Sequence, residues 1–394
     1  MNHVTIPLCE LFQIGSSKRV LKSEWKDAGV PFYRGREVTR LAIDGSVNNE
    51  LFITEEHYTA LSKSNGVPSA GDIIITAIGT IGNSYIVQPT DRFYFKDASI
   101  LWMKRNSDVL SEYVNLWLKS TLFFEQLDRG NGATVDTLTI KKLQSVRIRL
   151  PPLAEQRRIV DILDEAFEAI AVARANAEQN RQNARSLFES HLQSVFSLRG
   201  EGWIDSRLGE IAEVQSGGTP TVSQKDFWGG DIPWYSSGEL NHTFTSVPER
   251  HITADGLEHS NAKLFPKGSL LVGMYDTAAL KMSILDRDGA FNQAIAGIKP
   301  NHRIDVEFIL HAINAAKPKL LLERRGVRQK NLSLGKIKDI SIPLPTLEIQ
   351  RSILVRIRKL AYETQRLQYL YQRKIAALDE LKQSLLHQAF SGQL

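Results

Sequence analysis

The feature that most constrains this chain is a stretch of sequence that occurs twice. Residues 138–196 and 332–390 share a strand-like segment, two prolines and a long helical pattern at a constant offset of 194 positions, which carries Gln156 to Gln350. A constant offset over roughly sixty residues leaves no room for an insertion between the copies. The sequence therefore contains an internal repeat.

Each copy predicts a short strand followed by a long helix. The prolines at 151 and 152, or at 343 and 345, are expected to end the strand and direct the chain into the helix, because proline fixes its own backbone and restricts its predecessor. Apolar or small residues then recur at three- and four-residue spacing over about 40 residues, or about 60 Å of helix. The predicted seam consists of Ile159, Leu163, Ala166, Ile170, Ala173, Ala177, Ala184 and Leu187 in the first copy, and Ile353, Ile357, Leu360, Leu367, Tyr371, Leu378, Leu381 and Leu385 in the second.

The two predicted helices are natural partners for each other. The first seam is rich in alanine at its middle, where the second carries leucine and tyrosine, and small residues facing large ones favour close helix packing. A pseudo-twofold relation between the copies would make the pair antiparallel. The alternative is that two amphipathic helices lie separately on unrelated domains.

The segments before each helix predict two globular units with one scaffold. In the second unit, residues 208–211, 232–235 and 267–272 echo residues 8–11, 30–33 and 70–75 of the first. The polar segments between these framework residues differ, and residues 216–220 have no clear counterpart in the first unit. This organisation predicts one task carried out on two different targets.

Composition places the chain among ordinary globular proteins. The 394 residues are 42% hydrophobic and 24% charged, with a net charge of +5, a basic balance that is compatible with nucleic acid. A single cysteine excludes an internal disulfide, and neither a signal peptide nor a long charge-free apolar run is apparent. We therefore expect a cytoplasmic protein that makes no contact with a membrane.

Catalytic motifs are missing from the sequence. There is no phosphate-binding loop of the G-x-x-x-x-G-K-[ST] type, no dinucleotide fingerprint and no H-E-x-x-H pair, and one cysteine cannot build a thiolate zinc site. We expect a protein that is not an enzyme by itself, with no catalytic residue, no cofactor and no metal.

Polar and basic residues in the loops of both units predict DNA binding. Arginine and lysine neutralise phosphates, whereas arginine, asparagine and glutamine can hydrogen-bond to base edges. The densest segment is the run from Arg324 to Lys330, which surrounds one glycine. The candidate DNA-binding residues are Lys18, Arg19, Arg34, Arg36, Arg129, Asn131, Thr219, Lys225, Ser236, Ser237, Asn241, Lys281, Asn292, Gln293, Arg325, Arg328, Gln329 and Lys330.

These motifs resemble a known family, the specificity (HsdS) subunits of type I restriction–modification systems. The resemblance is carried by residues 343–351 (PLPTLEIQR) and their twin at 150–157, by 217–220 (GGTP), by 227–234 (FWGGDIPW), and by the closing AFSGQL. It covers the whole chain, and the duplicated architecture makes it specific.

The resemblance implies an α+β fold in which two α/β target recognition domains are separated by the family's two conserved long helices, paired as an antiparallel coiled coil. It implies recognition domains at 1–150 and 199–344, and conserved helices at 151–198 and 345–394. Each recognition domain would read one half of an asymmetric, bipartite DNA target, and the helices would set the spacer and dock methyltransferase subunits, two in number. A restriction and translocation subunit would join through the complex, and catalysis would belong to these partners.

Two other functions remain open at the level of the sequence. The chain could be the specificity subunit of a type IIB-like or methylase-only system. It could also be a coiled-coil adaptor between proteins, which would leave the basic loops unexplained.

Overall fold

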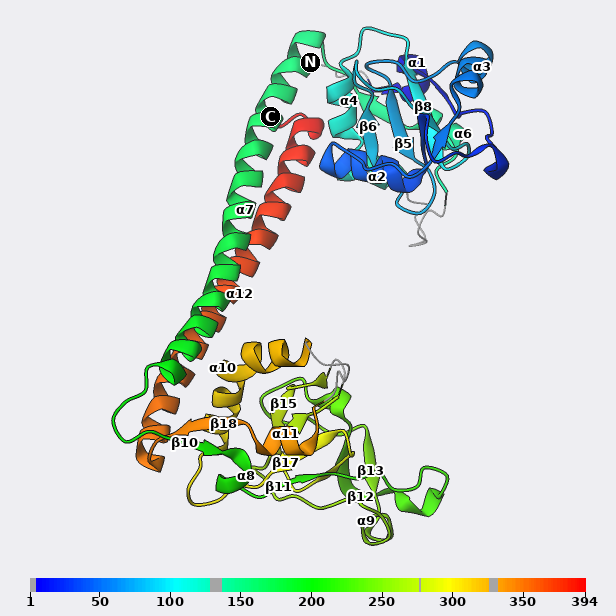
Figure 1. Ribbon diagram of the computed structural model, residues 1–394. Coiled ribbons are helices and arrows are strands. Elements are labelled where there is room, and N and C mark those ends of the chain that lie inside the picture. Colours follow the sequence, from blue (N-terminus) through cyan, green and yellow to red (C-terminus); the bar gives the residue numbers. More distant parts are fainter. Residues whose placement is uncertain (1–4, 128–136, 276–277, 326–331) are drawn as a thin grey trace. The chain divides into compact units, whose positions relative to one another are not determined.

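The structure is a computed structural model that describes residues 5–127, 137–275, 278–325 and 332–394, apart from the side chains of 322–325. The chain forms two compact units (Figure 1). The first contains residues 1–178 and 373–394, and the second contains residues 179–372. The globular parts are called the first head (residues 5–149) and the second head (residues 204–344).

The first head is built on a four-stranded antiparallel sheet whose central strands are apolar on both faces. Ile73 and Ile75 point into one core cluster, whereas Ile74, between them, belongs to a second cluster on the opposite face. This alternation follows from the two-residue period of a strand, and burial on both faces explains the uninterrupted isoleucine run. The strand order is β2 (Phe12–Gly15), β8 (Ile100–Arg105), β5 (Ile73–Thr76) and β6 (Ser84–Ile86).

A three-stranded sheet carries the part of the first head that matters for the site. Its middle strand β3 pairs antiparallel with β4 and parallel with β7. A separate two-stranded sheet joins the start of the head to its end through β1 and β9. The bounds are β1 (Thr5–Pro7), β3 (Val30–Tyr33), β4 (Phe52–Ile53), β7 (Tyr94–Phe95) and β9 (Arg147–Arg149), with helices α1 (Leu8–Leu11), α2 (Gly35–Asp44), α3 (Glu55–Asn65), α4 (Ser111–Trp117), α5 (Thr121–Leu127) and α6 (Ile140–Ser145) and the 3-10 turn η1 (Lys22–Glu24).

The second head repeats this topology strand for strand. A four-stranded antiparallel sheet, a three-stranded sheet with one parallel pair and a two-stranded sheet occur in the same connectivity. The four-stranded sheet has the order β11 (Val214–Ser216), β17 (Ile295–Ile298), β14 (Leu270–Gly273) and β15 (Met282–Ile284); the three-stranded sheet has the order β13 (Arg250–Ile252), β12 (Trp228–Tyr235) and β16 (Ala290–Phe291); and β10 (Ile204–Arg207) pairs with β18 (Ser341–Leu344).

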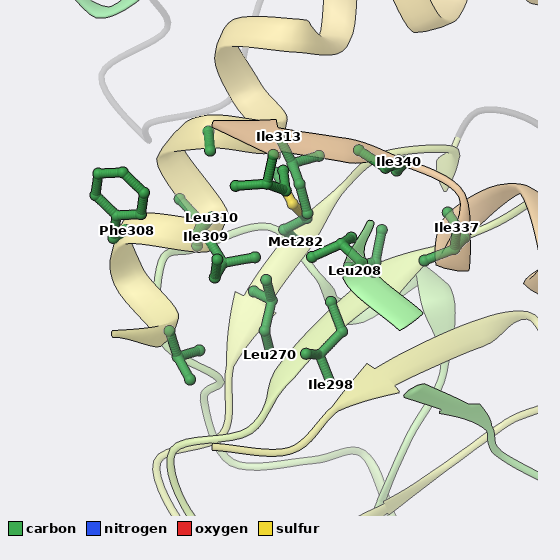
Figure 2. Packing of buried hydrophobic residues seen from close by; sticks show 14 of the residues in the cluster. Leu208, Leu270, Met282, Ile298, Phe308, Ile309, Leu310, Ile313, Ile337 and Ile340 are labelled. Carbon is green, nitrogen blue, oxygen red and sulfur yellow. The ribbon is translucent and has the colours of Figure 1, made fainter. Parts of the chain in front are cut away.

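The main core of the second head lies between the four-stranded sheet and its helices. Figure 2 shows Leu270 and Ile298 from the sheet facing Ile309 and Ile313 from a helix. Leu271, which lies between Leu270 and Val272, belongs to another cluster on the opposite face of the sheet, as Ile74 does in the first head. The helical elements are α8 (Leu208–Ile211), α9 (Ala254–Glu258), α10 (Val306–Arg325) and α11 (Leu334–Lys338), with 3-10 turns η2 (Lys225–Phe227) and η3 (Ser237–Glu239).

The repeat produces two helices of 45 residues each, α7 (Leu153–Ser197) and α12 (Leu347–Ser391). Each unit contains one half of both helices, and within each unit the halves run side by side (Figure 1). In the first unit Lys382 lies 4.9 Å above the Phe167 ring and Asp379 accepts from Arg174 at 3.2 Å, so numbers rise along α7 as they fall along α12. The pairing is antiparallel, as predicted.

The same repeat positions join each head to its helix pair. Ile159 and Leu163 of α7 share the core cluster of the first head with Leu386 and Phe390 of α12. Their counterparts at the constant offset pack into the core of the second head: Ile353, Ile357, Leu192 and Phe196. The fold is therefore α+β, with two α/β heads, an antiparallel pair of long helices and an internal repeat.

Parts of the predicted seam were wrong. Leu187, Leu367 and Leu381 are 55%, 40% and 46% exposed, whereas Thr364 and Ile375 are buried. An α-helix has 3.6 residues per turn, so a pattern read with a strict heptad drifts off the contact line. Thr364 is tolerated there because its hydroxyl donates to the carbonyls of Leu360 and Ala361.

One local prediction was also wrong. Pro343 does not end its strand but lies within β18, where it pairs with Asp205; β18 has β10 as its only neighbour in the described sheet, and proline is tolerated on an edge strand. The apolar segment 111–127 forms two helices, with a break between α4 and α5 where Ser120 donates from its hydroxyl to the Trp117 carbonyl at 2.6 Å.

Among the helices of the described residues, none is both long and apolar enough to span a membrane.

Candidate nucleic-acid interface

In the second head, the candidate residues meet at the carboxyl ends of the parallel strands. Strand β12 ends at Tyr235 and β16 ends at Phe291, and the Asn292 N–H donates to the Tyr235 carbonyl at 3.0 Å. Ser236 and Asn292, the next residues of the two strands, therefore emerge at the same edge. We call this edge of the second head the β12/β16 edge.

A glycine-rich segment crosses this edge. The Gly218 N–H donates to the Phe291 carbonyl at 2.9 Å, and the Thr219 hydroxyl donates to the Gln293 side-chain oxygen. A Cβ atom on Gly217 would lie 2.0 Å from the Phe291 carbonyl oxygen, and one on Gly218 would lie 2.3 Å from the backbone of Asn261. Only glycine fits so close an approach of two backbones.

The loop that follows β12 carries Asn241, which in turn contacts Lys281. The Glu239 carboxylate accepts the N–H of Ser236 at 2.6 Å and the N–H of Glu249 at 3.0 Å, which fixes the turn. Farther along the loop, the Asn241 side-chain oxygen accepts from the Lys281 ammonium at 3.1 Å. Lys281 directly precedes β15.

Most of the candidates of the second head are thus brought together by tertiary structure. Lys225 is different: it begins η2, and the neighbouring Asp226 carbonyl accepts from Thr253 at the start of α9. The residues that gather at the β12/β16 edge are Thr219, Ser236, Ser237, Asn241, Lys281, Asn292 and Gln293.

The first head has an equivalent edge. Strand β3 ends at Tyr33 and its parallel partner β7 ends at Phe95, and the Lys96 N–H donates to the Tyr33 carbonyl at 2.8 Å. The Ser17 hydroxyl donates to the Phe95 carbonyl at 2.7 Å, in place of the Gly218 N–H of the second head. The segment after β2 therefore crosses this β3/β7 edge and carries Lys18 and Arg19, both exposed.

Arg34 follows β3 at this edge and is held by an acid. Glu37, only 2% exposed, accepts the Arg34 N–H at 2.9 Å and pairs with the guanidinium groups of Arg34 and Arg36 at 2.9 and 3.0 Å. Burial by itself would raise the pKa of Glu37, but the hydrogen bonds from Arg34 and Arg36 outweigh it and hold that pKa at about 2. Arg36 also pairs with Glu50 at 2.6 Å.

The remaining candidates lie outside the described residues. Arg129 and Asn131 fall in the segment 128–136, and Arg328, Gln329 and Lys330 fall in the segment 326–331. The backbone of Arg325 is the last position of α10, and its side chain is not among those described.

Sequence reasoning missed Lys96 and the role of Glu37 and Glu239. Lys96 is exposed and directly follows Phe93-Tyr94-Phe95, an aromatic run that is buried throughout. That signal was available: a polar residue immediately after a buried strand lies at a sheet edge. What the sequence did not show is that β7 runs parallel to β3, which places Lys96 beside Arg34.

The chemistry at both edges suits a polyanionic, hydrogen-bonding ligand. Exposed lysines can neutralise phosphates, and the side chains of asparagine, glutamine and arginine can pair with base edges. In the described part of the chain, no group of three or more His, Cys, Asp or Glu side chains is arranged to hold a metal ion.

Comparison with known proteins gives a consistent result. A family model of the type I restriction modification DNA specificity domain matches residues 2–179 and 200–372. The specificity subunit of an Escherichia coli type I restriction enzyme is 29% identical over 215 residues, which are 51% of this chain and 50% of that protein. A putative type I specificity subunit of Haemophilus influenzae is 34% identical over 172 residues, 43% of this chain and 41% of that protein. The chain therefore spans half or less of the length of these two relatives.

Solved structures share the fold. A chain from work on complex assembly and conformational transition of the type I R-M system superposes with a TM-score of 0.80 at 20% identity, covering 100% of this chain and 99% of that one. The HsdS subunit from Thermoanaerobacter tengcongensis superposes with a TM-score of 0.63 at 19% identity, covering 99% and 97%.

Proposed function

Because this chain belongs to the type I restriction modification DNA specificity family, we propose that it is the specificity subunit of such a system and binds a bipartite, asymmetric DNA target. Each head reads one half-site. The division is a recognition domain at residues 1–150, a helix at 151–198, a second recognition domain at 199–344 and a second helix at 345–394.

The observation that carries this proposal is the duplicated edge. Both heads present polar side chains where a parallel strand pair ends, and in both the residue after one strand donates its N–H to the last carbonyl of the other. The side chains themselves differ, with Arg34 and Lys96 on one edge and Ser236 and Asn292 on the other. Like scaffolds with unlike side chains are what two different half-sites require.

The antiparallel helices set the spacer between the half-sites in this proposal. Each head is joined to the helix pair by buried apolar residues at equivalent repeat positions. Buried side chains of this kind are closely packed and do not yield independently of the helix backbone. A head that moves therefore moves with its helix ends.

The helices also dock methyltransferase subunits, two in number, and a restriction and translocation subunit joins through the complex. In the second unit, Val355, Tyr362 and Tyr369 recur at seven-residue spacing on α12 and are 65%, 65% and 62% exposed. An exposed apolar stripe at heptad spacing is suited to another helix. Replacing Tyr362 and Tyr369 by serine should remove the methyltransferase from affinity-purified complexes while the thermal midpoint of the isolated chain stays unchanged.

The role of this chain is recognition, in the cytoplasm, and it leaves methyl transfer and cleavage to the partner subunits. A map of methylated adenines tests the proposal in cells that express the chain with its methyltransferase, against cells without the chain. The expected result is a split motif with a fixed gap that appears only with the chain. An unchanged methylation pattern would refute the proposal and favour an adaptor role.

A further inference from the structure

We infer that the first head reads its half-site through Arg34, Thr39, Asn83 and Lys96, which occupy the positions of Ser236, Asn241, Lys281 and Asn292 in the second head. The inference rests on the proposed function and names the specificity-determining residues of the head whose loops lack a recognisable motif. Two of the four, Thr39 and Asn83, have no distinguishing signal in the sequence, and Lys96 is marked only by its place directly after a buried aromatic run.

In each parallel pair, the inner strand is the middle strand of the three-stranded sheet (β3 or β12) and the outer strand is its parallel partner (β7 or β16). The first position is the residue after the inner strand. Arg34 follows β3 and Ser236 follows β12. In both heads its N–H is accepted by a glutamate three residues later, Glu37 at 2.9 Å or Glu239 at 2.6 Å. The same acid thus fixes the same turn, and the side chain at the turn is the part that varies.

The second position is the residue after the outer strand of that pair. Lys96 donates its N–H to the Tyr33 carbonyl, and Asn292 donates its N–H to the Tyr235 carbonyl. In each head the acceptor is the last carbonyl of the inner strand. The first and second positions are therefore bonded neighbours in each head. The Lys96 side chain is exposed, whereas Asn292 is half-buried and its side-chain oxygen accepts the Ala294 N–H at 3.1 Å.

The third position directly precedes a strand of the four-stranded sheet. The carbonyl of Asn83, before β6, accepts from Thr76 at 3.0 Å, and the carbonyl of Lys281, before β15, accepts from Gly273 at 2.8 Å. Thr76 and Gly273 are themselves the matching last residues of β5 and β14. Asn83 and Lys281 are therefore equivalent, although one is an amide and the other a cation.

The fourth position is the side-chain partner of the third. Asn83 donates from its amide to the Thr39 hydroxyl at 3.4 Å, and Lys281 donates to the Asn241 side chain at 3.1 Å. Thr39 lies in α2 and Asn241 in the loop after η3, so both stand on the segment that follows the first position. One frame of four positions is thus present in both heads.

The chemistry of this frame differs between the heads in a way that fits two targets. The first head places two cations, Arg34 and Lys96, on neighbouring strand ends, whereas the second places its cation at the third position. A lysine at a base edge donates to guanine O6 and N7, and an asparagine pairs with adenine. The two heads are therefore built to prefer different bases at corresponding places.

Substitutions in the full chain, co-expressed with its methyltransferase subunit, test the frame. We would map methylated adenines for Lys96→Ala and Asn83→Ala in the first head and for Asn292→Ala in the second. The controls are Lys63→Ala and Asn48→Ala, two exposed residues of the first head that lie outside the frame. Duplex binding to the mapped target and the thermal midpoint of each variant would be measured alongside.

The expected result is that Lys96→Ala and Asn83→Ala relax or abolish one half of the motif, and that Asn292→Ala changes only the other half. Each should weaken duplex binding by roughly fivefold to 100-fold, with the spacer, the controls and the thermal midpoints unchanged. If the wild-type motif is split but Lys96→Ala and Asn83→Ala bind and methylate as wild type, or act on the same half as Asn292→Ala, the frame is refuted. If wild type yields no split motif, the proposed function itself fails.

Discussion

The two heads solve one structural problem with different residues. Each must pass a segment of backbone across the end of its outer parallel strand. The second head does so with Gly217 and Gly218, whose backbone N–H groups bond directly, whereas the first uses the hydroxyls of Ser16 and Ser17. A side-chain bond keeps the backbones farther apart and tolerates a Cβ atom. The loop sequences can therefore diverge completely while the edge keeps its shape.

The glutamates beneath the two edges, Glu37 and Glu239, also share one role and differ in another. Glu239 accepts two backbone N–H groups, whereas Glu37 accepts one and carries two guanidinium groups. The constant function of the acid is to fix the turn. What differs is that Glu37 also orients charged side chains at the surface of the first head.

The largest effect should come from breaking the close approach in the second head. Gly217→Ala would place a methyl group 2.0 Å from the Phe291 carbonyl, so the strands must separate at the edge. We expect a loss of about 3 kcal/mol or more in the unfolding free energy, together with loss of one half of the methylated motif. Denaturant unfolding measures the first quantity.

The matched control is Gly15→Ala in the first head, where an added Cβ meets nothing within 4 Å. Equal destabilisation by both substitutions would contradict the difference between the two crossings.

Acid should destabilise both heads, each through one glutamate. The pKa of Glu37 lies at about 2, and in the second head the His311 ring 3.9 Å away and the hydrogen bonds from Arg358 lower the pKa of Glu307 to about 2. Because both pKa values are depressed below 4.5, the stabilisation is present above that pH and is lost as pH falls from about 4.5 towards about 2. Each group contributes at most about 3 kcal/mol.

Urea unfolding at pH 6 and pH 3 checks this prediction. Glu37→Gln should lower stability at pH 6 and flatten the loss between the two pH values, because the substituted side chain no longer titrates. An undiminished pH dependence in the Glu37→Gln and Glu307→Gln double variant would show that other groups are responsible.

The buried glutamines of the repeat sharpen the comparison at the base of each head. Gln350 bonds to the Asp305 N–H and to the carbonyls of Arg303 and Pro345, whereas Gln156 bonds to the Leu110 N–H and the Pro151 carbonyl. Truncation leaves these buried backbone groups unpaired. We expect Gln350→Ala to cost about 2–3 kcal/mol and Gln156→Ala slightly less, by denaturant unfolding.

Glutamate at either position is a useful second variant, since it keeps the acceptor and loses the donor. It should restore only the bond to the Asp305 or Leu110 N–H. Full rescue by glutamate would rule out a contribution from the donated bonds.

The smallest effect concerns a hollow of about 590 Å³ in the second head, which Ala312, Ala315 and Ala316 line. The aromatic contacts Phe196–Phe308 and Tyr113–Phe390 are equivalent in the repeat, so Phe308 corresponds to Tyr113. Four residues farther along each chain segment, Ala312 therefore corresponds to Trp117, which is buried in the first head. Ala316→Leu should partly fill the hollow and add about 1 kcal/mol of stability. Ala60→Leu, on the exposed surface of α3, should have no effect on the thermal midpoint.

Local patterns were sufficient to predict the repeat, the two long helices and the short strand before each of them. A proline pair followed by recurring apolar residues specifies a strand and a helix without reference to the rest of the chain, and α7 and α12 begin two residues after Pro151 and Pro345. Local patterns could not decide whether Leu187 or Phe188 belongs to the helix seam, because neighbouring apolar residues fit a heptad equally well. In the structure Leu187 is exposed and Phe188 is half-buried, and the packing of the helix decides between them.

The sequence by itself determined that this chain has two similar heads on two long helices and belongs to a DNA specificity family, because a constant offset and short-range periodicity are written in consecutive residues. Only the tertiary structure decided which side chains share an edge. Lys96 meets Arg34, and Asn292 meets Ser236, through one parallel strand pair in each head. That pairing is made by long-range backbone hydrogen bonds, which depend little on side-chain identity and so leave no pattern in the sequence.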